Sequence, residues 1–329
     1  MENNELVAVS LFFNEEQVPG KGEDSAMRIT GISNAALIAC MDGCGGAGAQ
    51  IYAKANNASG ARISAEHVGI ALRSWFLKEQ YGYWGTGNKT SSVLAAEMKA
   101  AINHELALLN EKYGGTESSV KSRLARTFPT TLAAILLEVV ATNTVRCISF
   151  WAGDSRTYVF KASGLQQTSR DDIRSHRDPF DALENDSRLS NLVSISNDFE
   201  IHTTEMLITE PCMVLTATDG CFSYFQSPME FEWVLLDTLT ESETPVQWET
   251  NLREVFGSYA SDDYTMNIAV LGFYHWSAVR NAYAPRWNEF KNKYYEPLQR
   301  ILAAEDRQAH ALLWQQYKQE YMGEDGRNI

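Results

Sequence analysis

Two Asp-Gly pairs, Asp42-Gly43 and Asp219-Gly220, each stand at the end of a long apolar run. The runs cover residues 35–41 and 213–218 and contain mainly apolar and small side chains. Such a run predicts a buried strand, and the glycine after the carboxylate lets the backbone turn sharply. Each pair therefore indicates a strand that delivers a carboxylate at its tip.

Two further acidic pairs stand just before strand-like runs. Glu23-Asp24 precedes the run 27–31, and Asp262-Asp263 precedes the run 266–273. Carboxylates at several strand ends can converge in space, where they repel one another unless cations hold them. Hard divalent cations prefer oxygen ligands. The sequence therefore predicts a metal–carboxylate site with two metal ions.

The elements that must position these carboxylates come in blocks. Strand-like runs are expected at 6–13, 27–31, 35–41, 130–140, 145–151, 157–160, 199–208, 212–218 and 266–273. Helical periodicity is expected at 65–80, 91–113, 229–239 and 246–259. Because strands follow one another before each pair of helices, the pattern favours a layered α+β fold over a βαβ wrap.

Two segments depart from this pattern. Residues 169–198 are polar and predict an irregular excursion whose acidic side chains, Asp171, Asp172 and Asp178, are solvated. Residues 276–321 have no strand pattern and carry aromatic side chains at helical spacing, with Pro297 expected to kink or break the helix. We expect this tail to pack on the body, and the alternative is that it docks a protein partner.

The composition excludes several classes of protein. A net charge of −14 over 329 residues argues against non-specific nucleic-acid binding, which needs a basic surface. Five cysteines without a Cys-x-x-Cys pair predict reduced, buried thiols. The acidic start of the chain does not resemble a secretory signal, and the longest apolar stretch, residues 131–141, is too short to span a bilayer. We therefore expect a cytoplasmic protein without membrane contact.

Six short motifs, in this order, resemble those of the metal-dependent type 2C protein serine/threonine phosphatases. They are Glu23-Asp24, Asp42-Gly43-x-Gly45-Gly46, Thr130-Thr131, Gly153-Asp154-Ser155-Arg156, Asp219-Gly220 and Asp262-Asp263-x-Thr265. One Asp-Gly pair is commonly a plain turn, but six motifs in the order of the family are far more specific. The resemblance, to a bacterial-type member, covers roughly residues 5–274 and leaves the tail outside.

The resemblance implies a four-layer αββα sandwich with two central antiparallel sheets, formed by residues 1–275. A helical extension, residues 276–329, would follow. Two Mn²⁺ or Mg²⁺ ions would bind at one edge of the sheets. By position, Asp42 would bridge both ions, Gly43 would offer its backbone carbonyl, and Asp219 and Asp262 would complete the ligands.

Three more acidic residues have implied roles. Glu23 and Asp24 would act mainly through metal-bound water, and Asp154 matches the residue that helps to hold a third, weaker metal ion in bacterial members. The excursion 169–198 lies where the family carries its variable flap. The alternative is that Asp154 forms a plain ion pair with Arg156.

The chemistry that such a centre supports is hydrolysis of an anionic phosphomonoester. Two cations about 3.5–4 Å apart bind phosphoryl oxygens and acidify a bridging water, so that the hydroxide attacks and no protein nucleophile is required. In keeping with this, the sequence has no Cys-x5-Arg loop, no Walker-type glycine-rich loop and no Gly-x-Ser-x-Gly elbow. None of the six histidines has the spacing of zinc ligands.

Two departures from the family pattern concern the substrate. The residue after the first Asp-Gly is usually histidine, and here it is Cys44, which either takes the catalytic place of the histidine or merely fills a small space. A thiol is a poorer proton donor near neutral pH. The family often has an arginine shortly before the Glu-Asp pair. Here the nearest basic residues are Lys21 and Arg28, and a lysine cannot form the bidentate fork of an arginine.

Three hypotheses for function follow. The first is a Mn²⁺- or Mg²⁺-dependent phosphatase that acts on phosphoserine and phosphothreonine in proteins. The second is a regulatory or binding module that keeps the fold but has little activity, which Cys44 and the missing arginine favour. The third is a two-metal hydrolase of small phosphomonoesters.

Overall fold

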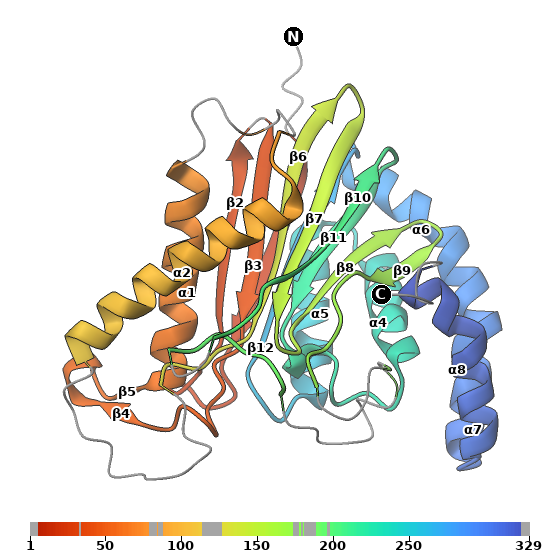
Figure 1. Cartoon of the computed structure of the whole chain (residues 1–329). Helices are drawn as coiled ribbons and strands as arrows, with labels where there is room; N and C mark the ends of the chain where they lie inside the picture. The colour runs from red at the N-terminus through yellow and green to blue at the C-terminus, as the bar shows by residue number, and fades with distance from the viewer. Residues whose placement is uncertain are drawn as a thin grey trace.

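The computed structural model describes residues 6–32, 34–78, 84, 88–113, 127–173, 178, 180, 189–195 and 198–323. Two five-stranded antiparallel sheets pack face to face between helices (Figure 1). The "β1 sheet" has the strand order β1-β12-β11-β8-β9 and the "β2 sheet" the order β10-β7-β6-β3-β2. The predicted α+β sandwich with two central antiparallel sheets is confirmed.

The strands of the β1 sheet are β1 (Val7–Glu15), β8 (Arg156–Lys161), β9 (Gly164–Gln167), β11 (Cys212–Ala217) and β12 (Tyr264–Leu271). Those of the β2 sheet are β2 (Ser25–Ile32), β3 (Ala35–Met41), β6 (Leu132–Ala141), β7 (Thr144–Ala152) and β10 (His202–Ile208). A separate hairpin joins β4 (Ile51–Tyr52) to β5 (Ala58–Ser59).

Four helices cover the outer faces of the sandwich. They are α1 (Gly60–Lys78) and α2 (Ser91–Tyr113) over the β2 sheet, and α4 (Pro228–Glu241) and α5 (Pro245–Tyr259) over the β1 sheet. Ser227 and Thr244 cap α4 and α5 by accepting backbone N–H groups, and each cap is followed by a proline whose missing N–H costs nothing at a helix start.

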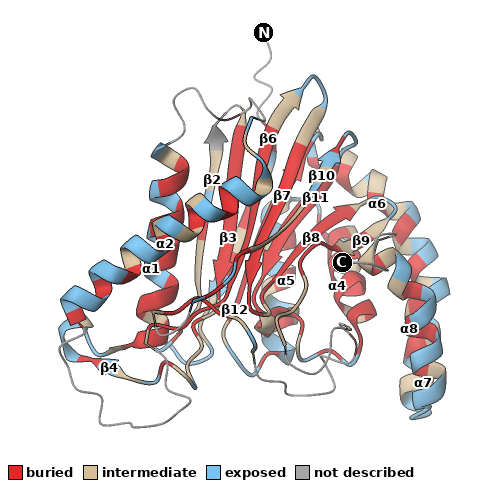
Figure 2. Ribbon diagram, in the orientation of Figure 1, coloured by how far each residue is buried: buried red, intermediate tan, exposed pale blue. Residues whose placement is uncertain are grey.

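The central strands are covered on both faces, which explains their unbroken apolar runs. All seven residues of β3 are buried, and so are all eight of β12. Figure 2 shows the middle of both sheets as a continuous buried layer. One set of side chains meets between the sheets: Ala36, Ile38, Ile135, Leu137, Val159, Val214 and Ala269. The alternate residues pack on the helices, so a strand here has no polar face.

The tail forms three helices that lie beside α4 and β9: α6 (Trp276–Phe290), α7 (Glu296–Ala303) and α8 (Arg307–Met322). A π-helical segment, η3 (Lys291–Tyr295), joins α6 to α7. The chain stays helical through Pro297, so of the predicted kink or break the structure shows no break. Pro297 lies at the start of α7, just after the π-turn, and the helix ends only after Ala303.

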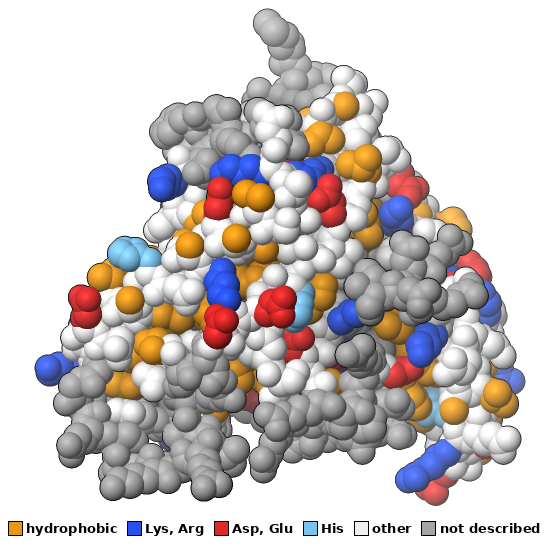
Figure 3. All heavy atoms as spheres, viewed as in Figure 1, with side chains coloured by type: hydrophobic (Ala, Val, Ile, Leu, Met, Phe, Trp, Pro, Cys, Tyr) orange, Lys and Arg blue, Asp and Glu red, His pale blue; other side chains and the backbone are white. Residues whose placement is uncertain are grey.

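The described side chains of the face shown in Figure 3 form no continuous basic patch, because acidic and basic groups alternate across it. Within the described part of the chain, no helix is both long and apolar enough to cross a membrane.

The solvated state expected for the acidic residues of the excursion was wrong. Asp171 forms a 2.7 Å ion pair with Arg156, and only 8% of the Asp171 side chain is exposed. Asp172 accepts the backbone N–H of Gly153, and Asp178 accepts the indole N–H of Trp314 on α8. These carboxylates therefore attach the excursion to the body and to the tail.

Candidate metal centre

Strand pairing brings the predicted acidic motifs to one end of the sandwich. In the β2 sheet, Ser25 pairs with Met41, so the Glu23-Asp24 pair before β2 lies beside Asp42 after β3. In the β1 sheet, Ala217 pairs with Met266, which places Asp219 after β11 beside the residues that precede β12. Asp154 follows β7, whose last residue pairs with the first residue of β6 at the same end.

Hydrogen bonds from the two threonines that precede β6 hold the backbone of Asp42. The Asp42 N–H donates to Thr131 Oγ1 at 3.0 Å, and the Asp42 carbonyl accepts from Thr130 Oγ1 and from the Thr131 N–H, both at 2.8 Å. Thr131 Oγ1 also lies 2.6 Å from Ser155 Oγ, beside Asp154. Three of the sequence motifs therefore form one hydrogen-bonded unit.

A second unit joins the two sheets through Asp24. Thr218 Oγ1 donates to Asp24 Oδ2 at 2.7 Å and accepts the Thr265 N–H at 2.9 Å. The Thr218 N–H donates in turn to the Thr265 carbonyl. Thr218 stands directly before Asp219 in the sequence, but no local pattern indicated that it joins the two sheets.

Asp263 orders the segment before β2. Its two carboxylate oxygens accept the backbone N–H groups of Gln17 at 2.8 Å and of Glu23 at 2.7 Å. Ser59 Oγ donates to the Glu23 carboxylate. A Cβ on Gly45 would lie 2.0 Å from Glu23 Oε2, so a larger residue there would require the Glu23 side chain to move.

The acidic groups raise one another's pKa. Burial, and then the nearby charge of Asp219, raises the pKa of Asp42 well above its ordinary value. Burial with neighbouring carboxylates raises the pKa of Asp24 and of Asp154 to about 8, and that of Asp219 to about 6. These mutual effects show that the carboxylates lie within electrostatic range of one another in a poorly solvated site.

Arg156 is a buried cation near this cluster. Its charge lowers the pKa of Asp154 and of Asp219, against the larger effect of burial. Its guanidinium pairs with Asp171 and stacks over Phe222 at 4.0 Å, so the alternative of a plain Asp154–Arg156 pair is not what the structure shows. Arg156 belongs to one of the sequence motifs, but the sequence alone did not indicate that its partner is Asp171.

The donor set suits hard cations. All the side-chain donors are carboxylate oxygens, and Asp154 Oδ1 is buried without a hydrogen-bond partner. Among the described residues, however, no group of three or more His, Cys, Asp or Glu side chains is arranged so that it could hold a metal ion. The fit is therefore one of donor chemistry and shared location, and the carboxylates would have to rotate toward a bound ion.

Comparisons with known proteins agree on the architecture. Neither a protein-family profile nor a curated protein matches the sequence. Among solved structures, serine/threonine phosphatase Stp1 from Staphylococcus aureus aligns with a TM-score of 0.58 at 15% identity, over 83% of this chain and 98% of Stp1. Phosphatase PstP/Ppp from Mycobacterium tuberculosis aligns at 0.55 with 19% identity, over 82% and 100%.

The chain has the fold of the PPM-type serine/threonine phosphatases. A further structure of this fold, the catalytic domain of PstP in complex with two manganese ions, aligns at a TM-score of 0.54 with 19% identity, over 81% of this chain and 99% of that one.

The two departures from the phosphatase pattern have clear positions within this fold. The Cys44 Sγ lies 3.9 Å from the Asp42 carbonyl, and burial with nearby carboxylates raises the pKa of its thiol well above the ordinary value. Lys21 is exposed in the loop before Glu23. Arg28 is exposed on β2 and stacks over Phe12 at 5.1 Å. The substrate-binding roles of Lys21 and Arg28 remain predictions.

Proposed function

We propose that this protein is a metal-dependent phosphatase that hydrolyses phosphoserine and phosphothreonine in proteins. The observation that carries the proposal is the cluster of half-buried carboxylates, Asp24, Asp42, Asp154 and Asp219, drawn from both sheets to one end of a phosphatase fold. Clustering of like charges costs stability, so the arrangement is explained best by cations that balance it.

The residues that would hold the metal ions are Asp42, Asp219 and Asp262, with the Gly43 carbonyl. Glu23 and Asp24 would contribute through bound water, and Asp154 would serve a third ion. When bound, a pair of Mn²⁺ or Mg²⁺ ions would supply charge neutralisation for the phosphoryl group and an activated water. The threonines that bind Asp42 and Asp24 would hold these carboxylates in position while charge develops on the phosphoryl group.

Cys44 is a poor candidate for either nucleophile or acid. Its thiol has a raised pKa and therefore stays protonated at neutral pH. Such a thiol is a weaker general acid toward a leaving alkoxide than an imidazolium would be. We infer that the enzyme acts slowly on alkyl phosphates compared with a protein that has histidine at this position.

Two alternatives remain in view. A low-activity regulatory module is favoured by Cys44 and by the loop 19–22, which has no arginine. A hydrolase of small phosphomonoesters would use the same carboxylates. We place the activity in residues 1–275 of a cytoplasmic protein, with residues 276–329 as an extension that rests on the body.

The deciding experiment is hydrolysis of a phosphothreonine peptide with Mn²⁺, with Mg²⁺ and with chelator. We expect turnover only with metal, and loss of turnover by at least about 100-fold in Asp42→Asn. Asp198→Asn is the matched control, because the Asp198 side chain is 91% exposed. Full activity in chelator, or in Asp42→Asn, would show that the proposal is wrong. Turnover of aryl phosphates alone would favour the third hypothesis.

A further inference from the structure

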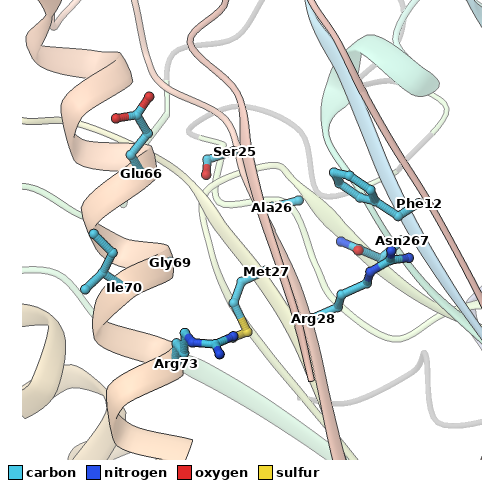
Figure 4. Close-up of a pocket in the computed structure, with 10 residues that line it drawn as sticks. All are labelled: Phe12, Ser25, Ala26, Met27, Arg28, Glu66, Gly69, Ile70, Arg73 and Asn267. Carbon is cyan, nitrogen blue, oxygen red and sulfur yellow. The ribbon is translucent and has the colours of Figure 1, made fainter. Parts of the chain in front are cut away.

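A pocket of about 380 Å³ lies at the edge of the β2 sheet, between α1 and the facing strands of the β1 sheet (Figure 4). It begins at Ser25, directly after the candidate metal ligand Asp24, and continues along β2 to Arg28. Its volume falls within the usual range of binding pockets, about 300–1,000 Å³. The pocket adjoins the metal centre but shares no residue with it.

The strand that the pocket follows is the last of its sheet. Among the described residues, β2 pairs with β3 alone, so alternate backbone N–H and C=O groups of β2 point outward. The corresponding edge of the β1 sheet is blocked, because Glu249 on α5 accepts the N–H of Phe12. An open strand edge of this kind can accept an extended peptide as an additional strand.

Two arginines face this edge from opposite sides. Arg28 lies over the ring of Phe12, and Arg73 projects from α1 beside Met27 (Figure 4). Neither forms an ion pair with any described residue, so both are available to an acidic ligand. The one carboxylate in the pocket wall, Glu66, is bound at 3.0 Å by Arg62.

A buried acceptor adds a second, independent sign of a ligand. Asn267 on β12 is fully buried, and its Nδ2 donates to the Ala39 carbonyl at 2.9 Å. Its Oδ1 has no hydrogen-bond partner, although Asn267 lines the pocket. Buried polar atoms are rarely left unpaired, so a donor from a bound molecule would satisfy this oxygen.

We propose that the free edge of β2 docks an extended, acidic segment of the phosphoprotein substrate, which adds to the sheet as a strand. Side chains of a strand alternate between two faces. One face of the segment would meet Arg28 and Asn267, and the other would meet Arg73 and the apolar surface of Met27 and Ile70. An acidic residue on either face would then meet an arginine that has no ion pair within the described part of the chain.

The position of the β2 edge determines how far the acidic side chain of the substrate should stand from its phosphoresidue. This step rests on the proposed function. Asp24 and Arg28 are four residues apart on an extended strand, which separates them by about 13 Å. A substrate with its phosphoresidue at the metal centre would place an acidic side chain at Arg28 about three to five residues away along its own chain.

The test is a set of phosphothreonine peptides with one glutamate moved through an otherwise neutral sequence. We expect kcat/KM to rise about 3- to 10-fold when glutamate stands three to five residues from the phosphothreonine on one side. Because strand side chains alternate between faces, Arg28→Gln should reduce the preference to less than about 2-fold for glutamates on one face, and Arg73→Gln should do so for glutamates at the alternate positions. Arg300→Gln, an exposed arginine on α7, is the matched control.

A second measurement does not depend on turnover. Binding of an unphosphorylated peptide with alternating glutamate and valine should slow amide hydrogen exchange in Ser25–Ile32 and lose affinity in Arg73→Gln. If no peptide is hydrolysed but this protection appears, the proposed function fails and the docking site stands. The docking site is overturned if glutamate position has no effect and no protection appears. It is also overturned if β2 pairs with a second copy of the chain, seen as a dimer that excludes the peptide.

Discussion

Replacing Arg286 by methionine should test how strongly the tail is joined to the body. Arg286 on α6 donates to the Glu232 carboxylate on α4 at 2.7 Å and 3.3 Å, and both side chains are at most 2% exposed. Tyr317 on α8 donates to the same carboxylate. Arg286→Met removes one partner and leaves a buried charge uncompensated, which costs about 3–5 kcal/mol.

This loss in the free energy of unfolding corresponds to a lower melting temperature. An unfolding entropy of about 2.1 cal/mol/K per residue gives about 0.7 kcal/mol/K for the 329 residues, so Tm should fall by about 4–7 °C. Burial already raises the pKa of Glu232, and Arg286 opposes that shift. Without Arg286 the pKa rises further. A carboxyl group with a raised pKa stabilises the folded state below pH 4.5, its ordinary pKa, and this stabilisation is lost as the pH rises. The variant should therefore be less stable at pH 8 than at pH 5.

The assay is thermal unfolding at both pH values, with Arg300→Met as the exposed control that should shift Tm by less than about 1 °C. The double variant Glu232→Gln with Arg286→Met should recover much of the loss, because it removes the stranded charge. A melting temperature of Arg286→Met within about 1 °C of the parent at both pH values would refute the reasoning.

Three further predictions concern the metal centre. Metal-free protein should lose stability as pH rises from about 4 to 8, because Asp24 and Asp154, each with a pKa of about 8, stabilise the fold only while they are protonated. Addition of Mn²⁺ should restore the melting temperature. A Tm that does not change with pH in chelator would contradict this prediction. Asp219→Asn should abolish turnover yet melt no lower than the parent in chelator, and near-parental kcat at saturating Mn²⁺ would remove Asp219 from the ligands. Cys44→His should raise kcat on phosphothreonine more than on an aryl phosphate, and equal effects would exclude proton transfer at this position.

The tail makes a different contribution from the metal centre. Trp233 on α4 stacks on Tyr295 at a centroid distance of 4.0 Å, and Phe160 on β8 packs against Tyr283. Removing residues 275–329 would expose these surfaces of the body. We expect the shortened protein to be less soluble and to melt lower. A truncated protein that is monomeric and equally heat-stable would show that the tail serves a partner instead.

Local patterns in the sequence were enough to predict the helices, the strands and the carboxylates that stand at the strand ends. The periodicity that predicted a helix at 91–113 matches α2 residue for residue, and the apolar run 35–41 matches β3. Glycine and carboxylate at the ends of such runs indicated where acidic groups would collect. These features depend on neighbours within one turn or one strand, so the sequence alone carries them.

Only the tertiary structure decided which distant residues meet. Asp171 and Asp178 look like solvated charges in sequence, but the first pairs with Arg156 and the second meets Trp314, 136 residues away. That Arg28 and Arg73 lie at a free sheet edge, without an ion pair to any described residue, is likewise invisible until the sheet order is known. The reason is physical: a charge is solvated or paired according to which surface is packed against it, and packing between distant segments is set by the whole fold and not by local pattern.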